Sequence, residues 1–567
     1  MDSRRAPARA STTVMVTQLW RWFSDARRFE EATRNATAAQ HKKLMSIVKA
    51  NRDTVYGREH GFGSINSIAD YQRNVPINDY DTLSPYVDRM AAGEPGILTA
   101  ESPVMFAQTS GTTGKQKLIP VNSTSLAEYN HAVQTHTWRA LEDHPEAGVG
   151  QFMVTSSKDV EGRTSAGIPY GAMSGYVVKR QPALVRSRFA LPYEVGTITQ
   201  VELKYYMTLR MALTSDVSAL SSLNPSTILL LCQKLQQYSE ELIRDVRNGT
   251  ANALGPLPDW LEKAVAPKLS PNPRRADELA SLLRSSGELR PTEIWPNLAI
   301  VLCWKGGTMP LYFRQLQRWF PGLPIRDRGY MASEGCGSIP LTDAGSAGAL
   351  AITTSFYEFI PVDERENENP RVLTCGELQP NREYYILFTT SGGLYRYDIN
   401  DVIRVADFYR DVPLIEFVRK GRGMTSLTGE KLAEQQVTLA MMNTLDSLGA
   451  EDTIRHFAAV PVFGSPPRYA FFLELTKDLS DGHLQAMARR LDEALFRENV
   501  EYETKRDSLR LGPPLLRVVA PGTFEAYRQE RVSKGAPEAQ VKVPHLTPDQ
   551  NFGREFTVVR EIEQVAP

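Results

Sequence analysis

Short apolar runs alternate with helical patterns through most of this chain, and this alternation restricts the folds that it can adopt. The strand candidates are residues 151–155, 298–303, 349–355 and 384–389. The helix candidates are residues 123–143, 200–214, 225–248 and 273–286. Strands that alternate with helices over roughly 300 residues predict a large α/β domain that contains more than one sheet.

The segment before this region has a different pattern. Residues 15–52 show two consecutive helical periodicities. Residues 56–83 are rich in turn-forming side chains, which predicts a linking segment with one short helix.

The last third of the chain has a more regular order of elements. We expect helices at 430–446, 481–499 and 522–534, and strands at 455–461, 468–475 and 515–519. This order predicts a small α+β domain with a split β-α-β arrangement. The Gly-rich, charged segment RKGRGMTSLTGE indicates a hinge. We therefore predict a large domain at 1–418, a hinge at 419–430 and a small mobile domain at 431–567.

Composition excludes several function classes. The net charge of −1 and the lack of a long Lys/Arg run argue against nucleic-acid or anionic-membrane partners. The four cysteines are widely spaced, which disfavours a zinc site or a disulfide scaffold and fits a reducing compartment. No apolar run reaches the length of a membrane span, and the one near the start is too short for a signal peptide. We expect a cytoplasmic protein.

The stretch TSGTTGKQK, residues 109–117, lies between two strand-like runs. It does not match the Walker pattern G-x-x-x-x-G-K-[ST], because Gly111 and Gly114 are too close and Gln116 follows Lys115. Glycines still let backbone N–H groups approach an anion, and hydroxyls and lysines bind phosphate oxygens. Alone, the stretch fits an ordinary turn or a phosphate-binding loop equally well.

Two further motifs follow this loop in a fixed order. RDRGYMASEGCGSIP stands at 326–340, and GLYRYDINDVIRV stands at 393–405. The order of loop, Y-x-x-S-E and Y-R-x-x-x-x-D resembles the adenylate-forming superfamily of acyl synthetases. Within it the chain resembles the Gretchen-Hagen family of acyl acid amido synthetases, which are auxin-responsive enzymes in plants, and we expect a bacterial member. The supporting segments are NRDTVYGREHGF, GIPYGAMSG, FYEFIPV, EYYILFTTSGGLYRYDINDV and GAPEAQVKVPHL.

The resemblance implies a reaction in two halves. A carboxylate would attack the α-phosphate of ATP with Mg²⁺ to give an acyl-adenylate and pyrophosphate, and an amino-acid amine would then attack the activated carbonyl. The alternatives are an acyl-CoA ligase, or another enzyme that uses the same adenylate, and a non-catalytic nucleotide-binding regulatory protein. Small-molecule acids and amino acids are the expected partners of a monomer or homodimer.

The resemblance also implies site residues. Glu334 would bind Mg²⁺, Asp401 would accept the ribose hydroxyls and Tyr330 would pack on adenine. The implied catalytic residues are Lys117, Ser333, Glu334 and Lys542. The implied ATP-binding residues are Thr109, Ser110, Gly111, Thr112, Thr113, Gly114, Gly306, Gly307, Tyr330, Ser333, Phe356, Asp401 and Arg419.

The sequence departs from the family pattern at two positions. Asn400 replaces the usual Gly before Asp401, but Asn tolerates positive φ better than most residues. Asp398 stands where plant members carry a basic residue. For the acyl acid we expect contacts from Arg163, Tyr170 and Met173, although a solvent-facing role for Arg163 is the simpler interpretation.

Overall fold

A computed structural model of the chain describes residues 23–109, 117–306, 310–365, 367, 369–421, 423–450, 453–533 and 544–564. These residues divide into two compact units. The large unit lies within residues 1–108 and 118–418, and the small unit is formed mainly by residues 419–567.

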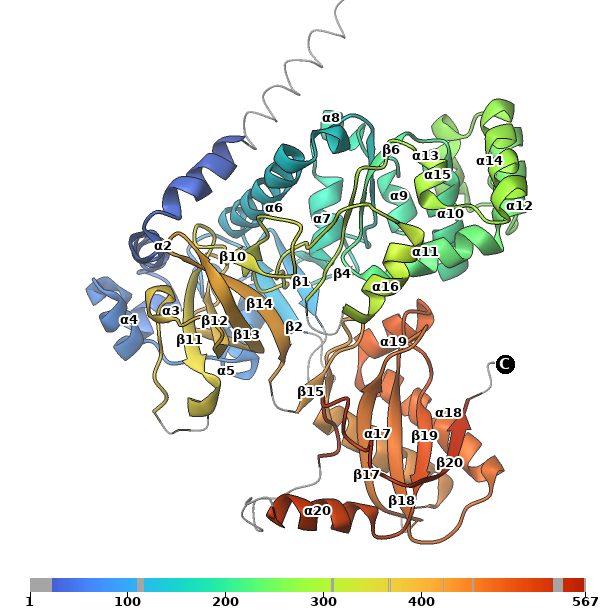
Figure 1. Cartoon of the computed structure of the whole chain (residues 1–567). Helices are drawn as coiled ribbons and strands as arrows, with labels where there is room; N and C mark the ends of the chain where they lie inside the picture. The colour runs from blue at the N-terminus through green and yellow to red at the C-terminus, as the bar shows by residue number, and fades with distance from the viewer. Residues whose placement is uncertain are drawn as a thin grey trace, which may run out of the picture. The chain divides into compact units, whose positions relative to one another are not determined.

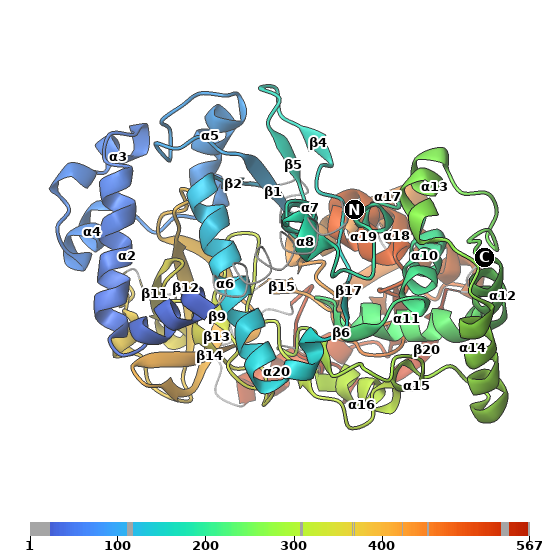
Figure 2. The same cartoon turned by 90° about the horizontal axis from the view of Figure 1, so that it is seen from above.

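A four-stranded parallel sheet organises one half of the large unit, with the order β3-β6-β7-β8. Every residue of β6 and β7 is buried, as expected for a parallel sheet covered by crossover helices. Helices α10, α11, α12 and α14 gather beside this sheet (Figures 1 and 2). The strands are β3 Gln151–Val154, β6 Val217–Ser221, β7 Ile300–Leu302 and β8 Ile325–Arg326. The helices are α10 Val201–Leu213, α11 Pro225–Gln237, α12 Ser239–Asn248, α13 Asp259–Val265, α14 Pro273–Ser286, α15 Pro291–Ile294 and α16 Pro310–Trp319.

A six-stranded antiparallel sheet organises the other half of the large unit, with the order β11-β12-β13-β14-β10-β9. Helix α2 packs against β11, and α6 packs against β9. The strands are β9 Ser338–Ile339, β10 Gly348–Leu350, β11 Phe356–Pro361, β12 Glu383–Thr389, β13 Tyr397–Tyr409 and β14 Val412–Lys420. The nearby helices are α2 Ala36–Ala50, α3 Val55–Glu59, α4 Ile68–Asn74, α5 Tyr80–Ala91 and α6 Ser123–Asp143.

A third sheet in this part of the chain has the order β2-β1-β5-β4. Strand β1 pairs with β5 in parallel, and the short strand β4 pairs with β5 in the antiparallel sense. Its strands are β1 Met105–Thr109, β2 Lys117–Val121, β4 Gly162–Arg163 and β5 Pro169–Gly171. The short helices α7 Met173–Lys179, α8 Ala183–Arg186 and α9 Tyr193–Gly196 follow β5.

The small unit contains a four-stranded sheet in the order β17-β18-β19-β20. Strands β18 and β19 are parallel and are connected through α18 and α19, which is the predicted β-α-β arrangement. The strands are β17 Ile454–Val462, β18 Arg468–Leu475, β19 Leu515–Val519 and β20 Val558–Glu563. The helices are α17 Glu434–Leu448, α18 Asp481–Glu498, α19 Val500–Asp507 and α20 Thr523–Ser533. The short strands β15 Met424–Thr425 and β16 Leu432–Ala433 pair before α17.

The mixed α/β prediction with several sheets is confirmed, and well-capped elements have the predicted ends. Helix α14 begins at Pro273, where the Asn272 side chain accepts from the Arg275 N–H, and it ends at Gly287 with φ +75°. The predicted range 273–286 is therefore correct. None of the helices in the described ranges has the length and apolar character needed to cross a bilayer.

Three predictions of local structure are wrong. The predicted helix 225–248 is two helices that are separated at Tyr238. The predicted strand 349–355 is limited to β10, and a turn follows it. Residues 56–83 are not a linking segment, because they form several helices and their Tyr56 and Tyr71 side chains are buried in the large core.

Candidate functional site

The Y-x-x-S-E motif forms a tight turn between β8 and β9. Ala332 and Gly335 exchange two backbone hydrogen bonds, and Met331 pairs with Cys336. This arrangement leaves Ser333 and Glu334 at the tip of the turn. A Cβ atom on Gly335 would lie 3.3 Å from the Phe388 ring, so the turn packs closely on β12. The sequence spacing thus fixes where the Ser and Glu side chains are presented.

Ser333 and Glu334 line a cavity of about 40 Å³ within the large unit. Glu334 is 7% exposed, and its Oε2 atom is buried without a hydrogen-bond partner among the described residues. The rest of the lining is rich in small hydroxyl and glycine residues: Ser125, Thr354, Ser355, Thr390, Gly335 and Gly392. A buried carboxylate oxygen needs a cation or donor, and the cavity that Glu334 lines has space for a small polar group.

The donor set fits magnesium rather than zinc. No group of three or more His, Cys, Asp or Glu side chains that could hold a metal occurs in the described part of the chain. Mg²⁺ is usually bound by one or two carboxylates together with substrate phosphates, rather than by a cage of protein ligands. The unpartnered oxygen of Glu334 therefore fits a Mg²⁺ ion that arrives with a phosphorylated substrate.

Tyr330 and Asp401 form a second part of the site, next to the first. The Tyr330 hydroxyl donates to Asp401 Oδ2 at 2.5 Å, and both residues are buried. The Tyr330 ring stacks on Phe417, with ring centroids 5.8 Å apart. Asn400 has φ +57°, so the predicted tolerance of Asn for the left-handed bend is confirmed. Asp398 pairs with Arg365 at 2.5 Å, which compensates the extra negative charge noted in the sequence.

Gly337 is required for the position of the Tyr330 ring. A Cβ atom at residue 337 would lie 2.1 Å from Tyr330 Cδ1. We expect Gly337→Ala to displace the ring and to lower the free energy of unfolding by about 1–3 kcal/mol, as for an overpacked core. Chemical denaturation measures this loss. Gly63→Ala is the matched control, because a Cβ atom there meets no atom within 4 Å; equal effects of both variants would contradict the prediction.

Several cavity residues were missed by the sequence analysis. Glu128 on α6 pairs with Lys43 on α2, and both side chains also hydrogen-bond Ser391 at 3.0 Å. Burial raises the pKa of Glu128, and the nearby Lys43 charge opposes this shift. Gln40 on α2 donates to the carbonyl of Ser355 at 2.7 Å and positions that part of the lining. The only sequence features that pointed to this part of the cavity lining were the turn-prone pairs Thr353–Thr354 and Ser391–Gly392.

The structure brings together some of the predicted site residues. Met173 lines the same cavity as Ser333 and Glu334, and Tyr330 contacts Asp401. Gly306 is buried beside Trp304. Thr109 ends β1, Lys117 begins β2, and half-buried Arg419 lies near the end of β14. The remaining predicted residues lie outside the described ranges: Ser110, Gly111, Thr112, Thr113, Gly114, Gly307 and Lys542.

Three predicted site residues are not part of the lining of this cavity. Phe356 is fully buried in β11, where its ring packs edge-on against Tyr71 at 6.2 Å, and it does not line the cavity. Every residue of β11 is buried, which explains the apolar residue at this position, and the contact of Phe356 with ATP stays a prediction. Arg163 is exposed and donates to the Gly167 carbonyl at 2.7 Å, which agrees with the simpler interpretation. Tyr170 is half-buried in β5 and its hydroxyl lies against Gly162.

His136 on α6 gives the large unit a pH-dependent stability. Its Nε2 lies 2.7 Å from the Asp327 carbonyl oxygen, and burial and the Arg328 charge lower its pKa to about 3. The unfolded chain binds a proton near the usual pKa of 6.5, so this stability is present above that pH and is lost as the pH falls toward 3.

We expect acidification from about pH 7 to about pH 5 to cost up to about 2 kcal/mol through His136. The variant His136→Gln keeps a side-chain donor but does not titrate. Its unfolding free energy should therefore fall less over the same pH interval, as measured by denaturant titrations at both pH values. Parallel pH dependence in the two proteins would rule out this role.

The chain is a two-unit α/β protein whose large unit holds this carboxylate- and hydroxyl-lined cavity. Family models match most of the chain: the GH3 family N-terminal domain over residues 25–325, the central domain over 348–420 and the C-terminal domain over 435–551. The chain belongs to the GH3 family. The family resemblance predicted from the motifs is confirmed.

Curated relatives are similar over nearly their full length. Jasmonoyl–L-amino acid synthetase GH3.5 of Oryza sativa subsp. japonica is 27% identical, with 92% of this chain and 94% of the relative covered. Indole-3-acetic acid-amido synthetase GH3.3 of Arabidopsis thaliana is 26% identical, with coverages of 91% and 90%. The solved structure of AtGH3.15 acyl acid amido synthetase in complex with 2,4-DB has a TM-score of 0.65 at 22% identity, and covers 95% of this chain and 97% of its own. This structural similarity confirms the predicted fold class.

Proposed function

We propose that this chain activates a carboxylic acid by adenylation and then joins the acyl group to the amine of an amino acid. The full-length similarity to enzymes named as amido synthetases supports this function. The observation that carries it to this chain is Glu334, whose buried and unpartnered carboxylate oxygen faces a hydroxyl-lined cavity. A protein that only bound nucleotide would have no need to keep an uncompensated carboxylate there.

In the first half-reaction, an oxygen of the substrate carboxylate forms a bond to the α-phosphorus of ATP, and pyrophosphate leaves with the electron pair of the broken P–O bond. Glu334 would hold Mg²⁺, which supplies positive charge to the phosphate oxygens. Asp401 has two carboxylate oxygens suited to ribose hydroxyls, and Tyr330 fixes its orientation by donating to Oδ2. Ser333, at the tip of the turn beside Glu334, is the proposed donor to the α-phosphate.

In the second half-reaction, the neutral amine attacks the acyl carbon, the amine proton is lost and AMP leaves. Holding both reactants in one cavity converts this step into an effectively unimolecular one.

The sequence motifs support the remaining proposed contacts with the phosphates. We propose that the loop residues 109–114 bind the phosphates through backbone N–H groups and hydroxyls, and that Lys117 supplies charge. Lys542 and Arg419 would add positive charge, and Gly306 and Gly307 would let the adenine lie against the backbone. Tyr170 and Met173 remain candidates for contact with the acid, and Met173 has the stronger support because it lines the cavity.

The second candidate is an acyl-CoA ligase, which would use the same first half-reaction but a thiol as the acceptor. The names of the curated relatives favour the amine acceptor. A non-catalytic regulatory protein is disfavoured because Glu334, Asp401 and Lys117 are all retained.

A pyrophosphate-release assay over a panel of carboxylic acids tests the proposal. We expect ATP-dependent release with at least one acid and, after addition of amino acids, an amide product that mass spectrometry detects. If no acid releases pyrophosphate, the adenylation proposal fails. If coenzyme A and no amine consumes the acyl-adenylate, the amide proposal fails and the second candidate replaces it.

Other properties stay predictions. They are a bacterial origin, a cytoplasmic location, a monomeric or homodimeric state, partners restricted to small molecules, and a hinge at 419–430 between domains 1–418 and 431–567. A size measurement in solution and limited proteolysis of the purified chain would test the oligomeric state and the hinge.

A further inference from the structure

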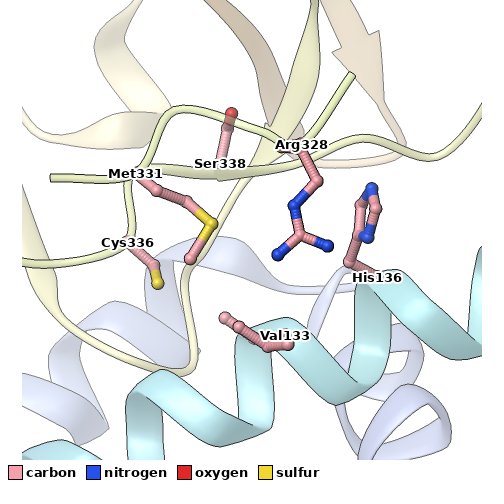
Figure 3. Close-up of a pocket in the computed structure, with 7 residues that line it drawn as sticks. Val133, His136, Arg328, Met331, Cys336 and Ser338 are labelled. Carbon is pink, nitrogen blue, oxygen red and sulfur yellow. The ribbon is translucent and has the colours of Figure 1, made fainter. Parts of the chain in front are cut away.

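A second, smaller cavity lies beside the motif turn in the large unit. It measures about 10 Å³, and Figure 3 shows the Arg328 side chain extending into it toward helix α6. Cys336 lines both this cavity and the larger one that contains Glu334, so the two are neighbours. The lining residues are Ala132, Val133, His136, Arg328, Met331, Cys336 and Ser338.

Arg328 lacks the carboxylate partners that its neighbour Arg326 has. Arg326 donates to Asp343 at 2.6 Å and to Asp143 at 2.5 Å. In contrast, the Nε atom of Arg328 is buried without a hydrogen-bond acceptor within the described ranges. Arg328 as a whole is half-buried, but a guanidinium stays protonated in a protein, and a buried N–H group of a charged side chain without an acceptor is costly. The Nε–H group of Arg328 therefore needs an acceptor that the described residues do not supply.

The other groups around Arg328 cannot provide that acceptor as an anion. Burial and the Arg328 charge keep His136 neutral, with a pKa of about 3. The carboxylate of Asp327 is a nearby negative charge, but its hydrogen bonds are with the backbone N–H groups of Lys305 and Gly329 rather than with Arg328. Val133, Ala132 and Met331 add an apolar wall, so the cavity combines a single fixed positive charge with apolar surface.

We propose that Arg328 recognises a carboxylate or other hydrogen-bond-accepting group at the tail of the acid substrate, beyond its reactive carboxylate. The inference rests on the proposed function and specifies its substrate class. The reactive carboxylate must reach the α-phosphate, and the proposed phosphate donor Ser333 and metal ligand Glu334 line the larger cavity, whereas Arg328 lines only the smaller one. The smaller cavity has space for about one water, so the flexible Met331 side chain would move to admit the tail group.

Matched acids test this specificity. Pyrophosphate release is measured with the dicarboxylates succinate through suberate, with 4-oxopentanoate, and with monocarboxylates of the same chain lengths. We expect kcat/KM to be at least ~10-fold higher for the best acceptor-bearing acid than for its apolar match, because a site built around a polar group rejects analogues that lack its partner. In Arg328→Met, that acid should lose ~100-fold, whereas its apolar match should be unchanged or better.

The variants separate the alternatives. Arg328→Lys keeps the charge and should retain part of the preference, and exposed Arg284→Met on α14 is the matched control that should change neither rate. Equal losses for all acids in Arg328→Met would show that Arg328 holds the reactive carboxylate, and would overturn the inference. A wild-type preference for plain hydrocarbon acids would also overturn it, even if Arg328→Met does not fold. Absence of pyrophosphate release with every acid is the distinct result that refutes the proposed function itself.

Discussion

Replacing Glu334 by alanine is expected to slow acid-dependent pyrophosphate release by at least ~100-fold, comparable to the loss of one electrostatic catalytic group. The carboxylate is 7% exposed, and its Oε2 has no partner among the described residues. Without this carboxylate, the Mg²⁺ ion that compensates the negative charge on the reacting phosphate oxygens would lose its protein ligand. Because the residue lies at the tip of a turn that backbone hydrogen bonds close, the substitution should leave the fold intact.

The magnesium dependence of the rate makes this test specific. Glu334→Gln keeps the shape of the side chain but removes its charge, so it should also be slow and should require more Mg²⁺ for half-maximal rate. Glu262→Gln on α13 is the matched control, because Glu262 is exposed, and it should retain the wild-type rate. Near-wild-type rates in Glu334→Ala, or an unchanged magnesium requirement in Glu334→Gln, would remove Glu334 from the metal role.

The local geometry of the site could be predicted from the sequence because it depends on short spacings. The four residues between Met331 and Cys336 suffice to form the turn that presents Ser333 and Glu334. The bend at Asn400 likewise depends on one residue's tolerance of positive φ. Such features follow from neighbouring residues alone, so a motif records them reliably.

The rest of the cavity could not be predicted, because distant segments form it. Lys43 and Glu128 are 85 residues apart in the chain, and Ser391 is 263 residues beyond Glu128. No local periodicity connects such positions. The same limit applies to Arg163 and Arg328, which carry the same charge in the sequence: only packing reveals that the first is exposed and that the second lines a cavity.

Packing also explains the arginine of the Y-R-x-x-x-x-D motif, which the sequence analysis left without a role. Arg396 is 5% exposed, and its Nε donates to Glu358 at 3.0 Å, where Glu358 is 1% exposed. Its Nη1 donates to the carbonyls of Gln72 and Val75 at 3.0 and 2.7 Å. The side chain therefore connects the start of β13 to β11 and to the end of α4. Its place in the motif, five residues before Asp401, is explained by this buried ion pair rather than by a contact with the cavity.

Arg396→Met is expected to lower the free energy of unfolding of the large unit by about 3–5 kcal/mol, because it leaves the Glu358 charge buried and uncompensated. Loss of the arginine would raise the pKa of Glu358 further. The stability linked to that raised pKa is present at low pH and is lost as the pH rises, so acidification should recover part of the loss. Denaturant titrations at two pH values measure both effects.

The double variant Arg396→Met/Glu358→Gln should be less destabilised than the sum of the two single variants, since it removes both charges. Arg404→Met, on the same strand, breaks an exposed pair with Glu416 and should cost no more than about 1 kcal/mol. Similar losses in Arg396→Met and Arg404→Met, or strict additivity in the double variant, would refute the buried-pair account.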